Sequence, residues 1–149
     1  MITHFAFGWL KSAGSTSKAF KHVGALALFE EYTKRISHYS ECRVTPLPII
    51  EAPAGALWLC HRGGSARTLS SEDLAKKLEA VRDSGTRTLT IGIGGADGFS
   101  VENLKILQPK FLWSFGPATY PHELAAVMAA EQLYRAWTIL HHLPYHTQH

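Results

Sequence analysis

Apolar residues either alternate with polar ones or form short runs at five places in the chain, and each place predicts a β-strand. The segments are residues 3–9, the start of 42–55, 56–60, 87–93 and 111–115. The run "ALWLC" at 56–60 is apolar throughout, which is typical of a strand buried on both faces of a parallel sheet. Pro46, Pro48 and Pro53 break the second segment, because proline cannot donate a ladder hydrogen bond.

Apolar residues recur at steps of three and four in four further segments, which predict helices. The helical segments are residues 18–39, 70–85, 100–108 and 122–140. The second is the clearest, since Ser70 precedes Asp73 in a capping-box-like pattern and Gly85 follows the last turn. The element order is therefore β-α-β-β-α-β-α-β-α. We expect one α/β domain, residues 1–149, with a largely parallel sheet flanked by helices.

The fourth predicted strand runs into a cluster of glycines in "LTIGIGGADGFS", residues 89–100. Ligands of open parallel sheets bind beyond the carboxyl ends of the strands, and glycine lets a ligand approach the backbone closely. The spacing is not that of a dinucleotide fingerprint, because Asp97 stands where the last glycine would be. It is not a phosphate-binding P-loop either, because the lysine is missing. A ligand loop and a plain strand-to-helix turn both fit the spacing.

The last third of the chain combines a proline-bounded loop, an alanine-rich helix and a histidine-rich tail. The loop "GPATYP" shapes the entry to the helix, and small residues in that helix favour either a close helix or subunit contact or simply high helix propensity. These residues are Ala125, Ala126, Ala129 and Ala130. The tail carries His141, His142, His146 and His149 without a nearby acid or cysteine, so we expect a solvent-exposed tail and no metal site.

Composition narrows the class of protein. The chain is 46% hydrophobic and 18% charged, which is typical of globular proteins, and its net charge of +3 permits a polyanionic partner without requiring one. No segment approaches the roughly 18 apolar residues of a membrane span, and the first lysine follows the apolar N-terminal stretch, unlike a secretion signal. Cys42 and Cys60 are too few for a disulfide framework. We expect a cytoplasmic protein with inert thiols and no membrane partner.

Four motifs in the last third occur together in a known family. "LTIGIGGADGFS", "LWSFGPATYPHEL", "AAEQLYRAWTI" and "PYH" follow one another near the family's spacings. With them the chain resembles the RlmH family of SPOUT-class methyltransferases. "FEEYTKRISHYSECRV" resembles that family's first helix and second strand, and "LCHRGGSARTLSSEDLA" resembles its "LD-x-x-G-K-x-x-S-S-E-E-F-A" stretch.

The resemblance implies an α/β fold with a C-terminal trefoil knot and a homodimer formed through the C-terminal helix. It implies that S-adenosylmethionine donates a methyl group to N3 of a pseudouridine of large-subunit ribosomal RNA in the assembled ribosome. By position, the implied cofactor-binding residues are Leu59, Gly94, Gly116, Pro117, Ala118, Thr119, Tyr120 and Pro121. The implied catalytic candidates are Arg135, which would stabilise an anion or hold a phosphate, His146, which would accept a proton, and Tyr145. RNA contact or dimer packing are the other interpretations of these three.

The chain also departs from the family pattern. A helix with basic residues is missing between the second strand and "ALWLC", and single replacements are Cys60 for aspartate, Gly64 for lysine, Gly116 for serine and Ala126 for arginine. Losing cations weakens binding to RNA phosphates. Two alternatives therefore stand beside the active methyltransferase. One is a degenerate, non-catalytic SPOUT-fold protein that binds cofactor or RNA. The other, suggested by the glycine loop alone, is a nucleotide-binding oxidoreductase-like domain.

Overall fold

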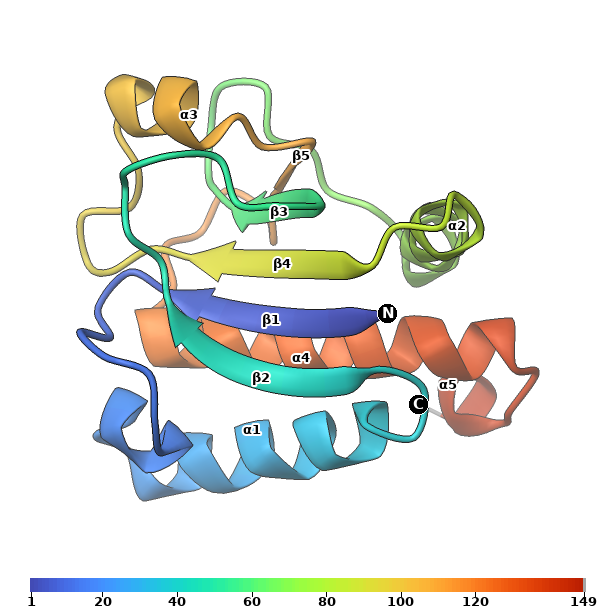
Figure 1. The fold of residues 1–149 in the computed structure, drawn as a ribbon. Helices are drawn as coiled ribbons and strands as arrows, with labels where there is room; N and C mark the ends of the chain where they lie inside the picture. The colour runs from blue at the N-terminus through green and yellow to red at the C-terminus, as the bar shows by residue number, and fades with distance from the viewer. Residues whose placement is uncertain (149) are drawn as a thin grey trace.

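Five parallel strands form one sheet in a computed structural model that describes residues 1–148 (Figure 1). The strands are β1 (Ile2–Phe7), β2 (Glu41–Pro46), β3 (Ala56–Cys60), β4 (Thr88–Ile93) and β5 (Phe111–Trp113). Their order across the sheet is β2-β1-β4-β3-β5, and every neighbouring pair is parallel. The predicted parallel α/β sheet is confirmed. All five carboxyl ends lie at one edge of the sheet, where the loops that follow them meet.

The helices are η1 (Thr16–Ala19), α1 (Val23–Ile36), α2 (Ser71–Asp83), α3 (Val101–Leu107), α4 (His122–Leu140) and α5 (Tyr145–Gln148). The cap expected for α2 is confirmed, since the Ser70 hydroxyl accepts a hydrogen bond from the Asp73 backbone N–H at 3.1 Å. The prediction of one continuous helix over 18–39 is wrong at its start. A separate 3₁₀ turn ends at Ala19, Phe20 has an extended backbone, and α1 begins at Val23. No helix among the described residues is long and apolar enough to cross a bilayer.

The buried carboxylate of Glu123, on α4, sets the start of α1. It accepts backbone N–H hydrogen bonds from Lys21 at 3.0 and 3.1 Å and from His22 at 3.0 Å. His22 is the N-cap residue, and its side chain makes no capping hydrogen bond. Helix N-termini leave backbone donors unsatisfied. A side chain about 100 residues away in the sequence satisfies donors at this one, so local sequence patterns cannot predict where α1 begins.

We expect Glu123→Ala to lower the free energy of unfolding by about 2 kcal/mol at neutral pH, because two backbone N–H donors before α1 lose their charged acceptor. Burial on its own raises the pKa of Glu123, but the hydrogen bonds from His22 and Lys21 outweigh it, and the pKa lies below its usual value. A lowered pKa means that this contribution is present above the unfolded-state pKa of about 4.3 and is lost as the pH falls through the folded-state pKa. Urea unfolding at pH 7 and at pH 3 measures both effects.

The control for this variant is Glu102→Ala, which removes an exposed carboxylate from α3. It should cost less than about 0.5 kcal/mol. Equal losses of stability in the two variants would contradict the capping role of Glu123.

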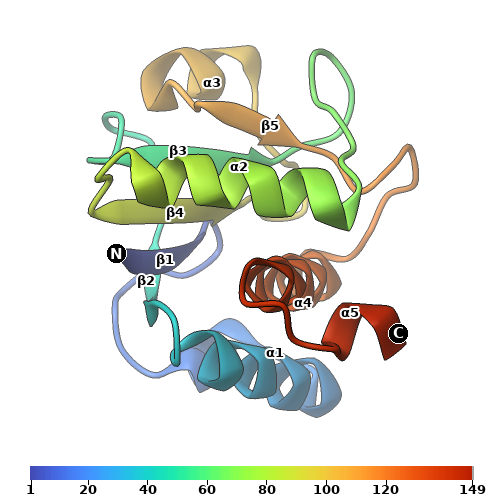
Figure 2. The ribbon, with the colours of Figure 1, turned by 90° about the vertical axis from the view of Figure 1, so that its right-hand side faces the viewer.

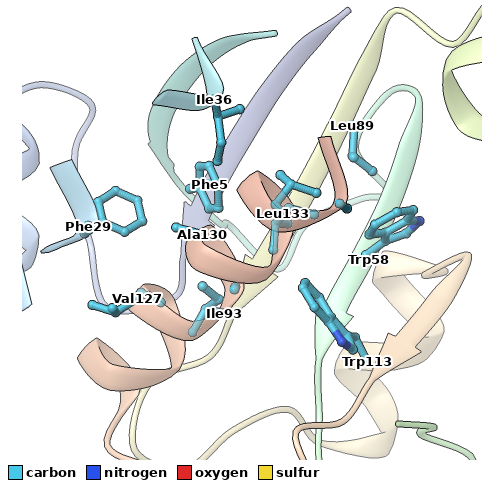
Figure 3. Close-up of a cluster of buried hydrophobic side chains, with 14 of the residues drawn as sticks. Phe5, Phe29, Ile36, Trp58, Leu89, Ile93, Trp113, Val127, Ala130 and Leu133 are labelled. Carbon is cyan, nitrogen blue, oxygen red and sulfur yellow. The ribbon is translucent and has the colours of Figure 1, made fainter. Parts of the chain in front are cut away.

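Three helices cover one face of the sheet, with α4 between α1 and α2 (Figure 2). Aromatic and aliphatic side chains from the sheet and these helices form the larger core cluster, as Figure 3 shows for Phe5, Phe29, Trp58, Trp113 and Leu133. Ala126, Ala129 and Ala130 are fully buried in this layer. The small residues let α4 pack closely against other elements of the same chain. These three alanines are therefore explained by packing within the chain and not by a subunit contact. An arginine in place of the buried Ala126 would not face solvent in this chain.

Nine residues, 47–55, connect β2 to β3 across the opposite face of the sheet. The connection crosses three strand spacings and returns along one strand length, which requires about 25 Å. Ten peptide links reach at most about 35 Å, and nine residues coiled into a helix would reach only about 14 Å. The segment is therefore not helical. It turns at residues 49–50 and ends at Gly55 (φ +80°), where a Cβ would lie 2.2 Å from the Thr88 carbonyl oxygen.

A second, smaller core cluster lies on this face, formed by Ala6, Leu47, Leu57, Leu59 and Leu107. It receives one residue from the short connection and one from α3. The RlmH pattern has a helix between the second and third strands. In this chain residues 47–55 take its place and contain no helix. The trefoil knot implied by the same resemblance stays a prediction.

Candidate active site at the carboxyl ends of the strands

A cavity of about 700 Å³ opens at the carboxyl edge of β3, β4 and β5. The loop after each of these strands contributes to its wall, and the first turn of α4 completes it. The lining residues are Cys60, His61, Arg62, Ile93, Gly94, Gly95, Ala96, Asp97, Gly98, Phe99, Trp113, Phe115, Gly116, Ala118, Thr119, Tyr120, Pro121, His122 and Ala125. Its volume is in the range of small-molecule sites, and its place matches the general rule for parallel sheets.

The loop that follows β4 is a tight, glycine-rich wall of this cavity. The Gly98 N–H donates to the Gly95 carbonyl at 3.0 Å, and Gly98 has a positive φ of 66°. A Cβ on Gly94 would lie 3.1 Å from the Gly98 Cα and 3.2 Å from a ring carbon of Phe99. Such contacts are tighter than most real Cβ contacts, so any side chain at Gly94 would push the Gly98 backbone or the Phe99 ring outward by a few tenths of an ångström.

The loop that follows β5 is held by a serine and an arginine. The Ser114 hydroxyl accepts the Gly116 N–H at 3.0 Å, and Gly116 has a φ of 108° that favours glycine. From the loop after β3, Arg62 donates to the Thr119 hydroxyl and, at 3.4 Å, to the Pro117 carbonyl. Arg62 thus ties two loops of the cavity to each other.

The cavity walls are mainly apolar, with few polar groups. Trp113 and Phe115 meet edge to face with ring centroids 5.0 Å apart. His122 lies 4.3 Å from the Trp9 ring, and Trp9 is anchored by its indole N–H to the Ala19 carbonyl at 2.7 Å. Burial raises the pKa of the Cys60 thiol far above its usual value, so Cys60 stays a neutral thiol at physiological pH. Asp97 is the one carboxylate in this lining.

Six of the eight residues predicted to bind cofactor line this cavity: Gly94, Gly116, Ala118, Thr119, Tyr120 and Pro121. Pro117 lines a neighbouring groove instead. Leu59 is fully buried, and its side chain packs in the smaller core cluster, while its neighbour Cys60 lines the cavity. Whether these residues bind a cofactor stays a prediction.

The three catalytic candidates lie together where α5 folds back on α4. With Glu131 and Glu72 they form what we call the Arg135 cluster. Glu131 holds it together, because its carboxylate accepts from Arg135 at 2.7 Å and from the Tyr145 hydroxyl at 2.7 Å. An Arg135 N–H lies 3.1 Å from His146 Nδ1, and His146 Nε2 lies 2.7 Å from a carboxylate oxygen of Glu72. Guanidinium only donates and carboxylate accepts, so Nδ1 accepts and Nε2 donates. The solvent-exposed tail expected from the sequence is wrong for Tyr145 and His146; His149 lies outside the described residues.

Three groups of this cluster have pKa values shifted from their usual ones. The Glu131 carboxylate raises the pKa of the Arg135 guanidinium. Burial, and after it the hydrogen bond to Glu131, raises the pKa of Tyr145 well above its usual value. The hydrogen bond from His146 lowers the pKa of the exposed Glu72 carboxyl. Tyr145 is therefore a hydrogen-bond donor at neutral pH, not a base.

The cavity and the Arg135 cluster lie at opposite ends of α4. Thirteen residues separate His122, in the cavity wall, from Arg135, which corresponds to about 20 Å along a helix. In Figure 1, α5 lies beyond the end of α4 that is remote from the carboxyl ends of the strands. The structure therefore brings the cofactor candidates together and the catalytic candidates together, but it does not bring the two sets together within one chain.

Sequence reasoning missed several polar residues of both places. His61, Arg62, Asp97 and His122 line the cavity. The first three lie in the loops that follow β3 and β4, and His122 begins α4. Their positions at the carboxyl edge of a parallel sheet are a signal that could have found them. Glu131 carried no such signal, because a glutamate on a helix surface is usually solvated. The described residues contain no group of three or more His, Cys, Asp or Glu side chains arranged to hold a metal ion.

Comparison with family models gives one match over most of the chain. The model described as "Predicted SPOUT methyltransferase" matches residues 49–146. This range contains all three loops of the cavity and the whole Arg135 cluster.

Curated relatives include proteins named "Ribosomal RNA large subunit methyltransferase H". The relative from Methylocella silvestris is 50% identical over 82 residues, covering 55% of this chain and 50% of the relative. That from Xanthomonas oryzae is 36% identical over 146 residues, covering 79% of this chain and 86% of the relative. The chain spans 50–58% of the length of the first relatives it matches.

A solved structure described as "a probable methylase family protein" from Haemophilus influenzae has a similar fold, with a TM-score of 0.50 at 12% identity. The similarity covers 97% of this chain and 68% of that one.

Proposed function

Since the chain belongs to the SPOUT methyltransferase family, we propose that it is an S-adenosylmethionine-dependent methyltransferase of large-subunit ribosomal RNA. The specific target that we propose is N3 of a pseudouridine in the assembled ribosome, and the place of action is the cytoplasm. The observation that carries the proposal is the cavity itself. The loops after β4 and β5, which the family motifs predicted to contact a cofactor, line one hollow of suitable volume.

The residues of the cavity fit S-adenosylmethionine. Gly94, Gly98 and Gly116 expose backbone to the hollow, which suits hydrogen bonds to the edge of an adenine ring, and Trp113 with Phe115 supplies apolar wall. The Asp97 carboxylate would favour a cation in the same hollow. When bound, S-adenosylmethionine supplies an electrophilic methyl group on its sulfonium. The chain's own contribution would be to orient the cofactor and exclude water from it.

The Arg135 cluster would act on the nucleotide. Methylation at N3 needs the N3 proton to leave, and the fixed charge of Arg135 would stabilise the resulting anion. His146 has an acceptor nitrogen, Nδ1, that would take the proton once it is released from Arg135. Tyr145, held as a donor by Glu131, would position the base by hydrogen bonding to a carbonyl oxygen.

A homodimer would bring this cluster to the cavity of the other subunit. The outer surface of α1 and α4 carries exposed apolar side chains, with Val23 82%, Leu28 49% and Leu124 44% exposed. A two-fold axis across the middle of α4 would bury them and set the two helices antiparallel. The first turn of one α4, beside the cavity, would then face the last turns of its partner, which carry Arg135.

Leu124→Glu is expected to raise the dimer dissociation constant at least about tenfold, because it places a charge in a desolvated apolar contact. Sedimentation velocity across a concentration series measures the change. Ile106→Glu, on α3 at the other face of the sheet, is 39% exposed in the native chain and serves as the matched control. A monomeric native protein, or equal behaviour of both variants, would contradict this dimer.

The proposed activity is tested with the purified protein, tritiated S-adenosylmethionine and bacterial ribosomes that lack the modification. We expect label in large-subunit RNA, mapped to one pseudouridine by mass spectrometry. If neither ribosomes nor isolated subunits accept label from a folded protein, the chain is not this enzyme.

A second function, binding without turnover, is favoured by one observation. The short connection over residues 47–55 leaves no room for the helix and basic residues of the RlmH pattern. Calorimetry that detects S-adenosylmethionine binding in a protein that transfers no methyl group would select this alternative.

A further inference from the structure

Arg62 and Arg67 line a second hollow that adjoins the cofactor cavity. This open groove has a volume of about 790 Å³, and its lining includes Gly63, Thr68, Ser114 and Pro117. Arg62 and Gly116 belong to both hollows. A molecule in the groove would therefore contact residues that also line the cavity.

The backbone fixes Arg67 at the edge of the sheet. Its N–H donates to the Leu112 carbonyl at 3.0 Å, and its carbonyl accepts from Ser114 at 2.9 Å, so this residue adds a bridge beside β5. The Arg67 guanidinium lies 6.0 Å from the Phe111 ring centroid, and the Lys77 ammonium lies 4.5 Å from the same ring. Arg62, Arg67 and Lys77 thus form a basic strip along the edge of the sheet.

The cations of this strip have no carboxylate partners in the part of the chain that the structure describes. Four arginines make ion pairs within the chain, namely Arg35, Arg43, Arg82 and Arg135. Among the described residues, Arg62 and Arg67 make no ion pair, and both are exposed to solvent. Unpaired guanidinium groups in an open groove suit an external anion with oxygens to share, and a row of them suits a polyanion.

We propose that the groove lined by Arg62 and Arg67 is the binding site for the RNA phosphates that flank the target nucleotide. This inference rests on the proposed function for the identity of the RNA. It also gives a role to the loop after β3, where Gly64 replaces the lysine of the RlmH pattern. The chain carries the positive charge of this loop at Arg62 and Arg67 instead.

The test uses Arg67→Gln, because Arg62 also braces the cofactor loop. Arg43→Gln is the matched control, since it removes the same charge from β2, at the opposite edge of the sheet. Binding to purified bacterial ribosomes is measured over a series of KCl concentrations. We expect Arg67→Gln to weaken binding about tenfold at low salt and to reduce the slope of log K against log[KCl] by about one, while Arg43→Gln changes neither.

Calorimetry with S-adenosylmethionine separates the groove from the cavity, and Arg67→Gln should bind it as the native chain does. Equal ribosome binding by the two variants overturns the inference, as does a loss of cofactor affinity in place of ribosome affinity. A native protein that binds no ribosomes overturns it too. Binding is read independently of methyl transfer, so a catalytically silent protein would refute the proposed activity while the salt slope still decides the role of the groove.

Discussion

Gly94→Val is expected to raise the dissociation constant for S-adenosylmethionine at least about 100-fold. A Cβ at this position points at the Gly98 backbone and the Phe99 ring, with gaps of 3.1 and 3.2 Å. The two further carbons of valine would have to displace the loop that forms one wall of the cavity. The added side chain meets protein before it meets the ligand space, so the loss of affinity would come from a displaced loop. Isothermal titration calorimetry measures the affinity.

Two controls accompany this variant. Gly24→Val adds the same side chain on α1, where a Cβ has no neighbour within 4 Å, and it should bind the cofactor normally. Gly95→Ala places a Cβ no closer than 4.0 Å to other protein atoms, so any loss of affinity there reports a ligand that passes over Gly95. Native affinity in a folded Gly94→Val protein would place the cofactor elsewhere.

Arg135→Ala is expected to lower methyl transfer at least about 100-fold and to leave cofactor affinity within about twofold. Arg135 lies about 20 Å from the cavity of its own subunit, and in the proposed dimer it acts on the nucleotide and not on the cofactor, so its loss should change cofactor affinity little. Loss of an electrostatic group that acts on a developing anion has effects of this size on the rate. Single-turnover transfer to ribosomes gives the rate, and calorimetry gives the affinity.

Mixing two inactive variants tests whether each site is built from two subunits. In a mixed dimer of Gly94→Val and Arg135→Ala chains, one site would combine the intact cavity of one subunit with the intact Arg135 of the other. Random exchange makes about half of the dimers mixed, so about a quarter of native activity should return. No recovery after demonstrated subunit exchange would show that Arg135 serves the cavity of its own chain or does not serve catalysis.

Glu131 explains why Arg135 is a demanding target for mutation. It accepts hydrogen bonds from Arg135 and Tyr145 in a largely buried site, with 12% and 18% of the Arg135 and Glu131 side chains exposed. Arg135→Ala leaves the Glu131 carboxylate with two neutral donors, Tyr145 and Gln132, which costs stability. Thermal unfolding of this variant must therefore be measured beside its activity, and Arg135→Lys, which keeps the charge, distinguishes loss of charge from loss of packing.

Most of the fold could be predicted, because most strands and helices are specified by the spacing of apolar residues and by capping residues close to them in sequence. The apolar run of β3, the Ser70 cap of α2 and the extent of α4 were read from residues that neighbour one another in sequence, and all three are confirmed. Gly94 and its loop were placed at the carboxyl edge of the sheet by the same reasoning. Parallel strands align these edges, so a local motif there predicts a shared position in space.

Other features depended on residues far apart in the chain. The start of α1 is set by Glu123, the tail is held by Glu131 and Glu72, and the buried alanines of α4 fit a surface made by the sheet. The sequence by itself determined the five strands and the four longer helices, their order and the loops that meet at one edge. Only the tertiary structure decided that Arg135 lies at the far end of α4 from the cavity and that Arg62 and Arg67 share a groove beside it. Both arrangements depend on how helices, strands and loops pack against one another. The periodicity of residues along the chain does not specify which side chains of different elements come into contact.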